Sequence, residues 1–127
     1  MLIEEEIDAG KIYTIVEFMP EFGDCGTSKD KSERKQISQK NLLQFIYKHI
    51  KYPTIALENG IEGRVFVRFT VNKEGLIQDA QILKEPGGGL GKEVLRVIKM
   101  MPKWKPGKQG LHPVKVQYTL PVEFKPI

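Results

Sequence analysis

The last long segment of the chain, VKVQYTLPVEF at residues 114–124, alternates more regularly than any other stretch. Its even-numbered positions from Val114 to Phe124 are apolar or aromatic, and most of the positions between them are polar. Successive side chains of a strand point to opposite faces, so the pattern predicts a strand with one buried and one exposed face. Pro121 has no N–H to donate to a ladder, which predicts that this strand lies at a sheet edge.

Two further stretches predict a β-hairpin. GRVFVRFTV at residues 63–71 alternates in the same way, the turn residues NKEG follow, and LIQDAQILKE at residues 76–85 can return antiparallel. The apolar residues Ile77, Ala80 and Ile82 change parity between positions 77 and 80. This change predicts a β-bulge or a late start of pairing in the second strand.

Helical spacing predicts two helices. For the first, Ser38 is a candidate N-cap, Pro53 ends the helix near Lys51, and the apolar positions follow at three- and four-residue spacing: Leu42, Phe45, Ile46, and His49 or Ile50. A short turn, TIALEN, follows and closes at Gly60. The second helix carries the apolar stripe Leu90, Val94, Val97, Ile98 and Met101 and ends at Pro102.

These elements predict an α+β fold with two layers, a three-stranded antiparallel sheet with two helices packed on one face. A chain of 127 residues suits one such domain. We expect the domain at residues 38–127, an extended arm at 1–22 and a flexible linker at 23–37. In the arm, IYTIVEFMPEF is expected to form one strand that Pro20 stops, and GDCGTSKDKSERKQ has no large apolar residue to bury. KWKPGKQGLHP is expected to be a loop.

No motif in the sequence predicts catalysis, a metal site or a cofactor. Cys25 has no second cysteine for a disulfide, and with only His49 and His112 besides it the chain lacks metal-ligand spacing. The stretch EPGGGLGKE fails as a phosphate loop, because Glu93 stands where a hydroxyl is needed, and its glycines are interpreted as a hinge before a helix. We therefore expect no enzyme activity and interpret Glu74, Asp79 and Glu93 as turn and surface residues.

The uneven distribution of charge along the sequence is compatible with several classes of partner. Residues 1–33 carry a net charge of −6 and residues 34–127 a net charge of +10. A basic domain can meet nucleic acid, anionic lipid or an acidic partner, although a solvated lysine-rich surface explains the balance equally well. Trp104 lies between lysines and can either stack on a base or cover the end of the sheet with its N–H on an outer acceptor. We favour the structural role and no nucleic acid. No apolar run is long enough to cross a bilayer, and the acidic start is unlike a signal peptide.

Several motifs in order resemble the C-terminal domain of TonB energy transducers, in the form common in Bacteroidetes. They run from about Leu42 to Phe124 and comprise Tyr52-Pro53, GIEG at 60–63, NKEGLIQDAQIL, the GGGL helix entry, MPKWKPG and HPVKVQYTLPVEF. The stretch IYTIVEFMPEF is similar to one that often precedes the domain in that subgroup. Three features depart from the family pattern: Lys51 stands where glutamine is common, Gly91 where an acidic residue is expected, and residues 23–36 where a short Pro-Gly turn is expected.

The resemblance implies a periplasmic domain at the end of an inner-membrane-anchored transducer, driven by proton-powered partners of the ExbB and ExbD type. Because the sequence holds no anchor or proline-rich spacer, we expect a fragment, a truncated reading frame or a domain of a larger sensor. The implied partner is the TonB box of outer-membrane receptors, which adds to the last strand. The implied contact residues are Val114, Lys115, Val116, Gln117, Tyr118, Thr119 and Leu120, with His49, Ile50, Lys51 and Tyr52 nearby. An alternative is a sensory or scaffolding domain fused to a membrane-bound peptidase. An open edge also allows a homodimer.

Overall fold

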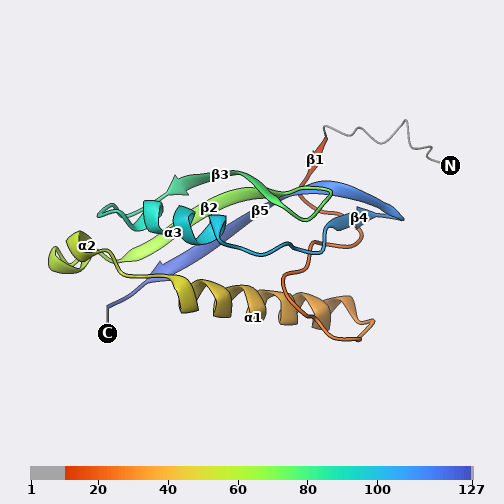
Figure 1. Cartoon of the computed structure of the whole chain (residues 1–127), viewed down its shortest axis with the longest axis horizontal. Coiled ribbons are helices and arrows are strands. Elements are labelled where there is room, and N and C mark those ends of the chain that lie inside the picture. The colour runs from red at the N-terminus through yellow and green to blue at the C-terminus, as the bar shows by residue number, and fades with distance from the viewer. Residues whose placement is uncertain (1–10, 127) are drawn as a thin grey trace.

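The computed structural model of the chain describes residues 11–126 (Figure 1). The elements follow in this order: β1 (Ile12–Tyr13), α1 (Lys31–His49), α2 (Thr54–Glu58), β2 (Gly63–Val71), β3 (Ile77–Lys84), α3 (Leu90–Lys99), β4 (Gly107–Gln109) and β5 (His112–Phe124). The sheet order is β1-β5-β2-β3, and β4 pairs with the beginning of β5.

The central ladder joins β2 and β5 in antiparallel register from Gly63↔Phe124 to Val71↔Val116 without a shift. β3 pairs antiparallel with the other side of β2. The α+β class and the antiparallel central sheet are therefore as expected, but the sheet is larger. β4 forms a hairpin with β5 inside the segment that was expected to be a loop, and β1 adds a short parallel pair.

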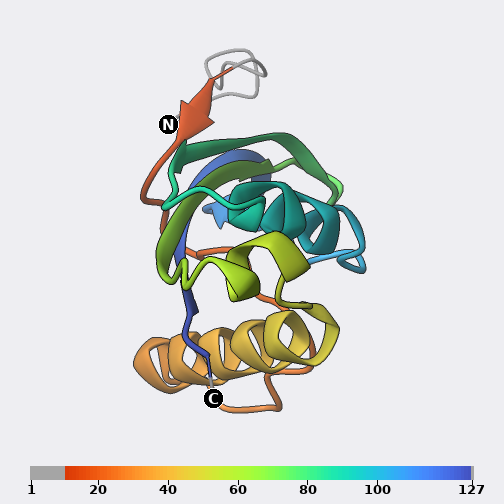
Figure 2. The same ribbon diagram turned by 90° about the vertical axis from the view of Figure 1, so that its left-hand side faces the viewer.

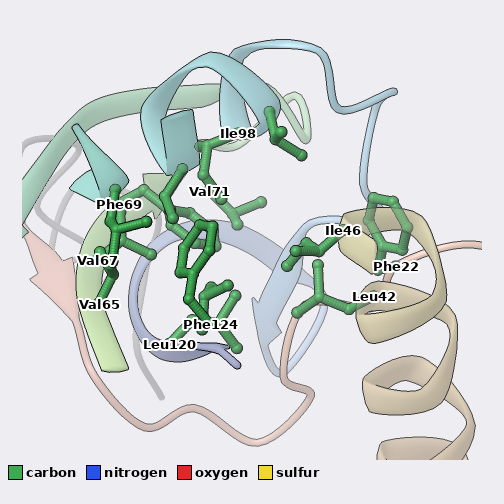
Figure 3. Packing of buried hydrophobic residues seen from close by; sticks show 14 of the residues in the cluster. Phe22, Leu42, Ile46, Val65, Val67, Phe69, Val71, Ile98, Leu120 and Phe124 are labelled. Carbon is green, nitrogen blue, oxygen red and sulfur yellow. The ribbon is translucent and has the colours of Figure 1, made fainter. Parts of the chain in front are cut away.

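The helices cover one face of the curved sheet, with α3 over β2 and β3 and α1 along the β5 side (Figure 2). The core joins alternate residues of β2 and β5 to the apolar stripes of the helices. Figure 3 shows this packing, with Leu42 and Ile46 of α1 beside Phe22 from the segment before it. Burying each such side chain contributes about 1.5–3 kcal/mol of transfer free energy. The alternating and helical patterns therefore predicted the buried faces correctly.

The bulge in β3 is confirmed. Pairing passes from Arg68↔Gln81 to Thr70↔Gln78, so β3 holds an extra residue there. Asp79 lies in that irregularity with a positive φ of 54°. The change of parity in the sequence therefore marks a real break in the ladder.

The first helix begins earlier than expected, and the interpretation of residues 31–37 as flexible linker is wrong. Asp30 is the N-cap, since its carboxylate accepts the N–H of Ser32 at 2.9 Å. Ser38 is not a cap. It is buried inside the helix and its Oγ accepts the N–H of Phe22 at 2.9 Å. The first turns are polar because they pack against the preceding segment through hydrogen bonds rather than an apolar stripe.

The arm is also folded differently from one continuous strand. After β1 the chain bends, and Phe18 and Glu21 form isolated bridges to Lys108 and Lys105. Val16 is buried in a small cluster with Val114 and Val116. Residues 1–10, the rest of the expected arm, lie outside the described part of the chain.

A bidentate ion pair fixes this segment to α1. The Arg34 guanidinium donates to both carboxylate oxygens of Glu21, at 2.7 and 2.8 Å, and to the carbonyl oxygens of Gly26 and Ser28. The hydrogen bond from Arg34 lowers the pKa of Glu21. Cys25 is buried in the same loop as a small free cysteine, and burial raises the pKa of its thiol.

The glycine stretch is a hinge, as expected. Gly87, Gly88 and Gly89 all have positive φ, at 105°, 66° and 84°, and the chain turns there from β3 into α3. A Cβ on Gly88 would lie 2.8 Å from the Cβ of Ala56. The acidic residue missing at position 91 has a substitute, because the Glu85 carboxylate lies at the start of α3, 3.4 Å from the Gly91 N–H.

Candidate interaction site at the outer edge of β5

One contact shows which backbone groups of β5 point to its outer edge, away from β2. The Tyr47 hydroxyl of α1 lies 3.3 Å from both the carbonyl oxygen and the N–H nitrogen of Glu123. The backbone groups of Glu123 therefore point away from β2. Backbone direction alternates along an antiparallel strand, and the register is unbroken, so Lys115, Gln117, Thr119 and Pro121 point outward as well.

β1 covers the beginning of this edge. It pairs parallel with β5 as Ile12↔Lys115 and Tyr13↔Val116. A residue in a parallel ladder bonds to the two neighbours of its partner, so Tyr13 accepts from the Gln117 N–H and donates to the Lys115 carbonyl. After Tyr13 the chain bends out of the ladder, and Val16 packs against Val114 and Val116.

The part of the edge beyond β1 is unpaired within residues 11–126. Its outward groups are the Gln117 carbonyl, the Thr119 N–H and carbonyl, and the Pro121 carbonyl. We call residues 117–121 the open edge. An extended guest segment can bond there through its backbone without disturbing the ladder to β2.

One side of α1 flanks the open edge. Leu43 and Tyr47 are 40% and 49% exposed, and Tyr47 reaches Glu123 at the far end. These two side chains stand one turn apart on the helix and offer apolar surface beside the edge. The site therefore combines unpaired backbone with a partly apolar wall.

The structure places the predicted strand residues in two groups. Val114 pairs with Gly107 of β4, Val116 bonds to β2, and the outward groups of Lys115 face β1, so the groups of these residues are already paired. From Gln117 to Leu120 the predicted residues coincide with the open edge. Pro121, whose carbonyl belongs to the open edge, and the contact between Glu123 and Tyr47 were not predicted as part of the site, although the alternation extends that far.

The second predicted segment lies against α3 rather than beside the open edge. The Lys51 N–H donates to the Glu93 carboxylate at 2.6 Å, and Arg96 donates to the carbonyl of His49 at 3.0 Å. Glu93, interpreted from the sequence as a surface residue, thus links two elements, and its hydrogen bond with Arg96 lowers its pKa.

Ile50 and Tyr52 close the same corner of the domain. Ile50 is the C-cap of α1, with its N–H bonded to the Ile46 carbonyl. Tyr52 packs edge-on against Phe124 with ring centroids 5.5 Å apart, and its hydroxyl donates to the Ile61 carbonyl. Tyr52 therefore supports the end of β5 from its buried side, where burial raises the pKa of its phenol.

Trp104 supports the other end of the strand. It is buried at 3% exposure and packs edge-on against Tyr118 and Phe22, with centroids 5.5 and 5.2 Å away. The structural role is thus confirmed, but the expected outer acceptor is wrong, since its indole N–H meets no acceptor within residues 11–126. The ring is inside the core and cannot stack on a base.

The described residues offer little for other chemistries. Within residues 11–126 no three histidine, cysteine or acidic side chains come together as metal ligands. No helix in the same range has the length and apolar character to cross a membrane. The arrangement at β5 is a partly unpaired strand edge, the kind of surface to which an extended peptide can add a strand.

Comparison with known proteins identifies the family. Residues 48–126 match the family described as Gram-negative bacterial TonB protein C-terminal. Because the match spans more than half of the sequence, the chain belongs to this family. It covers the core sheet, α2 and α3, and it excludes most of α1 and everything before it.

Two solved structures of one Helicobacter pylori domain agree with this assignment. The Helicobacter pylori TonB C-terminal domain, residues 194–285, is 26% identical with a TM-score of 0.53, and the match covers 68% of this chain and 91% of that one. A longer form of that domain, residues 179–285, is 25% identical with a TM-score of 0.53 and covers 83% and 98%. The Pseudomonas aeruginosa domain is 35% identical over 60% of this chain and 77% of that one, with a TM-score of 0.49. No curated protein sequence matches the chain.

Proposed function

We propose that this domain binds the TonB box of outer-membrane receptors by strand addition at the open edge, residues 117–121 of β5. It would act in the periplasm, without catalysis, as the receptor-binding end of a transducer that ExbB/ExbD-type partners power. The observation that carries the proposal is the set of four unpaired outward groups on Gln117, Thr119 and Pro121, in a chain that belongs to the TonB C-terminal family.

The expected hydrogen-bond energies suit weak, reversible binding of the peptide. Each backbone hydrogen bond contributes about 0.5–1.5 kcal/mol net, so four bonds give a few kcal/mol before apolar contacts with Leu43 and Tyr47 are added. Backbone bonds are largely indifferent to side-chain sequence, which lets one domain serve several receptors. A pull along the strand direction loads these bonds together in shear, so a weak clamp can transmit force.

The other edge of the sheet is less suitable for a guest. β3 carries the bulge at Asp79, which breaks the even spacing of backbone groups, and it ends in Lys84. Bulges and lysines are features that keep sheet edges from pairing. The β5 edge is regular from residue 116 to residue 124, and this regularity favours it as the docking strand.

The test is Thr119→Pro, with binding of a TonB-box peptide measured by titration. Proline removes the one free N–H of the open edge while leaving the groups that face β2 in place. We expect binding to weaken at least about tenfold, the equivalent of 1.4 kcal/mol. Thr119→Ala, which keeps the N–H and changes only the side chain, is the control and should leave binding unchanged. Equal binding by the Thr119→Pro protein would contradict the proposal.

An open edge can also pair with a second copy of the chain. We therefore propose a weak homodimer through β5 that competes with the peptide. Sedimentation across a range of protein concentrations tests it, and the peptide should shift the protein toward monomer. Dimerisation that the peptide leaves unaffected would place the dimer contact elsewhere.

A further inference from the structure

A hollow of about 580 Å³ lies next to the open edge. Its walls come from the arm at residues 17–21, from the first turns of α1 with the loop before them, and from the β4–β5 hairpin, and Tyr118 of β5 also lines it. The arm and the first turns of α1 lie outside the family match at residues 48–126. Part of the hollow is therefore built from segments outside the family match.

The hollow continues the path beside the open edge. Gln39 of α1 lines both this hollow and a shallower stripe that runs along the helix past Leu43 to Tyr47. Tyr47 contacts Glu123 at one end of the edge, and Tyr118 opens onto the hollow near the other. A guest segment on the open edge thus has the hollow at the Gln117 end.

β1 directs a longer guest into this hollow. Tyr13 already bonds to the Lys115 carbonyl and the Gln117 N–H. A guest strand therefore cannot continue along β5 from Gln117 toward Lys115. Tyr118, the next residue along β5, lines the hollow together with the first turns of α1. The flank of the guest that passes Gln117 therefore leaves the sheet and meets the residues that line the hollow.

The lining is basic around an apolar floor. Its cationic side chains are Lys29, Lys31, Arg34, Lys35, Lys105 and Lys108. The acidic residues of the lining are Glu17 and Glu21, and Glu21 already pairs with Arg34 and, at 3.9 Å, with Lys105. The floor includes Phe18 and Leu111, which are 46% and 91% exposed, and the Lys31 ammonium lies 4.6 Å from the Phe18 ring centre.

We propose that this hollow binds an acidic, apolar flank of the guest peptide, adjoining the part that adds to β5. The inference rests on the proposed function, since the flank reaches the hollow from the open edge. Carboxylates on the flank pair with the lysines, and an apolar side chain between them covers Phe18 and Leu111. Receptors that use this domain would then carry acidic residues on one side of their box, and this would separate them from receptors of other transducers.

The experiment compares three synthetic peptides with the same seven-residue strand-forming centre of alternating valine and threonine. One has a neutral Gln-Leu-Asn flank at each end, and the others replace one flank, at the N-terminal or the C-terminal end, by Glu-Leu-Asp. Binding to the chain of residues 1–127 is measured at about 50 and 300 mM salt, on either side of the ionic strength at which the Debye length is 8 Å. We expect one acidic flank to tighten binding about tenfold at low salt and to lose most of that gain at high salt.

Two double variants test whether the gain in affinity from the acidic flank arises in the hollow. In the double variant Lys31→Gln, Lys35→Gln, the gain from the acidic flank should disappear while the neutral peptide binds as before. Lys92→Gln, Lys99→Gln on α3 removes the same charge away from the hollow and should keep the gain. Equal binding of neutral and acidic peptides, or an equal loss in both double variants, would overturn the inference.

Two outcomes separate this inference from the function on which it rests. If the neutral peptide binds at the open edge and the acidic flank adds nothing, the strand-addition site stands and the hollow does not. If no peptide perturbs the Thr119 amide, the proposed function itself fails. A single-stranded oligonucleotide that displaces the acidic flank more strongly than free glutamate does would assign the hollow to nucleic acid and overturn the peptide proposal.

Discussion

The Tyr47 hydroxyl bridges the carbonyl and the N–H of Glu123, each at 3.3 Å, and so holds α1 against the outer edge of β5. This contact ends the open edge on one side, as β1 ends it on the other. Tyr47→Phe should free both backbone groups of Glu123. We expect its amide to exchange with deuterium faster, while the amide of Val122, which faces β2, stays unchanged. Unchanged exchange at Glu123 would show that the bridge does not form in solution.

Removal of β1 should lengthen the open edge. In a chain that starts at Thr14, the amides of Lys115 and Gln117 lose their cover and should exchange faster, whereas Val114 and Val116 keep their protection. A peptide long enough to span residues 115–121 should then bind several-fold tighter than it binds the full chain, since more outward groups are available. If the truncated chain binds long and short peptides equally, β1 does not limit the site.

The ion pair between Glu21 and Arg34 predicts a dependence of stability on pH. Because the pKa of Glu21 is lowered in the folded protein, its stabilising effect is present above the unfolded pKa of about 4.3 and is lost as pH falls through the folded value. Glu21→Gln should lower the thermal midpoint by a few degrees at pH 7, and the effect should shrink steadily as the pH falls below about 4.3. Glu74→Gln is the control, because Glu74 makes no ion pair within residues 11–126. A loss at pH 7 that persists near pH 3 would contradict this assignment.

Gly88 should tolerate no side chain. With a φ of 66° and Ala56 at 2.8 Å from its added Cβ, Gly88→Ala combines backbone strain with overpacking and should cost about 2–4 kcal/mol in the free energy of unfolding. Gly26→Ala has similar strain, at a φ of 74°, but meets open space, and should cost about 1 kcal/mol. Chemical denaturation of both variants measures the difference, and equal costs would mean that the contact with Ala56 is relieved by movement.

Those parts of the fold that depend on local sequence patterns were predicted correctly. Alternation marked β2 and β5, and the parity change marked the bulge at Asp79. In each case the signal is a side-chain period that burial imposes. The edge position that Pro121 predicted holds only for the later part of β5, since β1 pairs with its beginning.

The parts that were missed depend on long-range contacts between polar residues. The first turns of α1 have no apolar stripe to mark them. Ser38 resembles a cap because it stands just before the apolar positions of the helix, but its Oγ accepts from Phe22, a residue distant in the sequence. Similarly, nothing in IYTIVEFMPEF indicates that Ile12 and Tyr13 pair parallel with β5, or that the hollow forms beside them. Such features require knowledge of which segments meet in space.

The most direct measurement of the central claim is amide exchange along β5, with and without a TonB-box peptide. Without peptide, the account predicts fast exchange at Thr119 between the slow amides of Tyr118 and Leu120. With peptide, Thr119 should become protected while its neighbours change little. Protection of Thr119 in the free protein, or binding that leaves its exchange fast, would contradict strand addition at this edge.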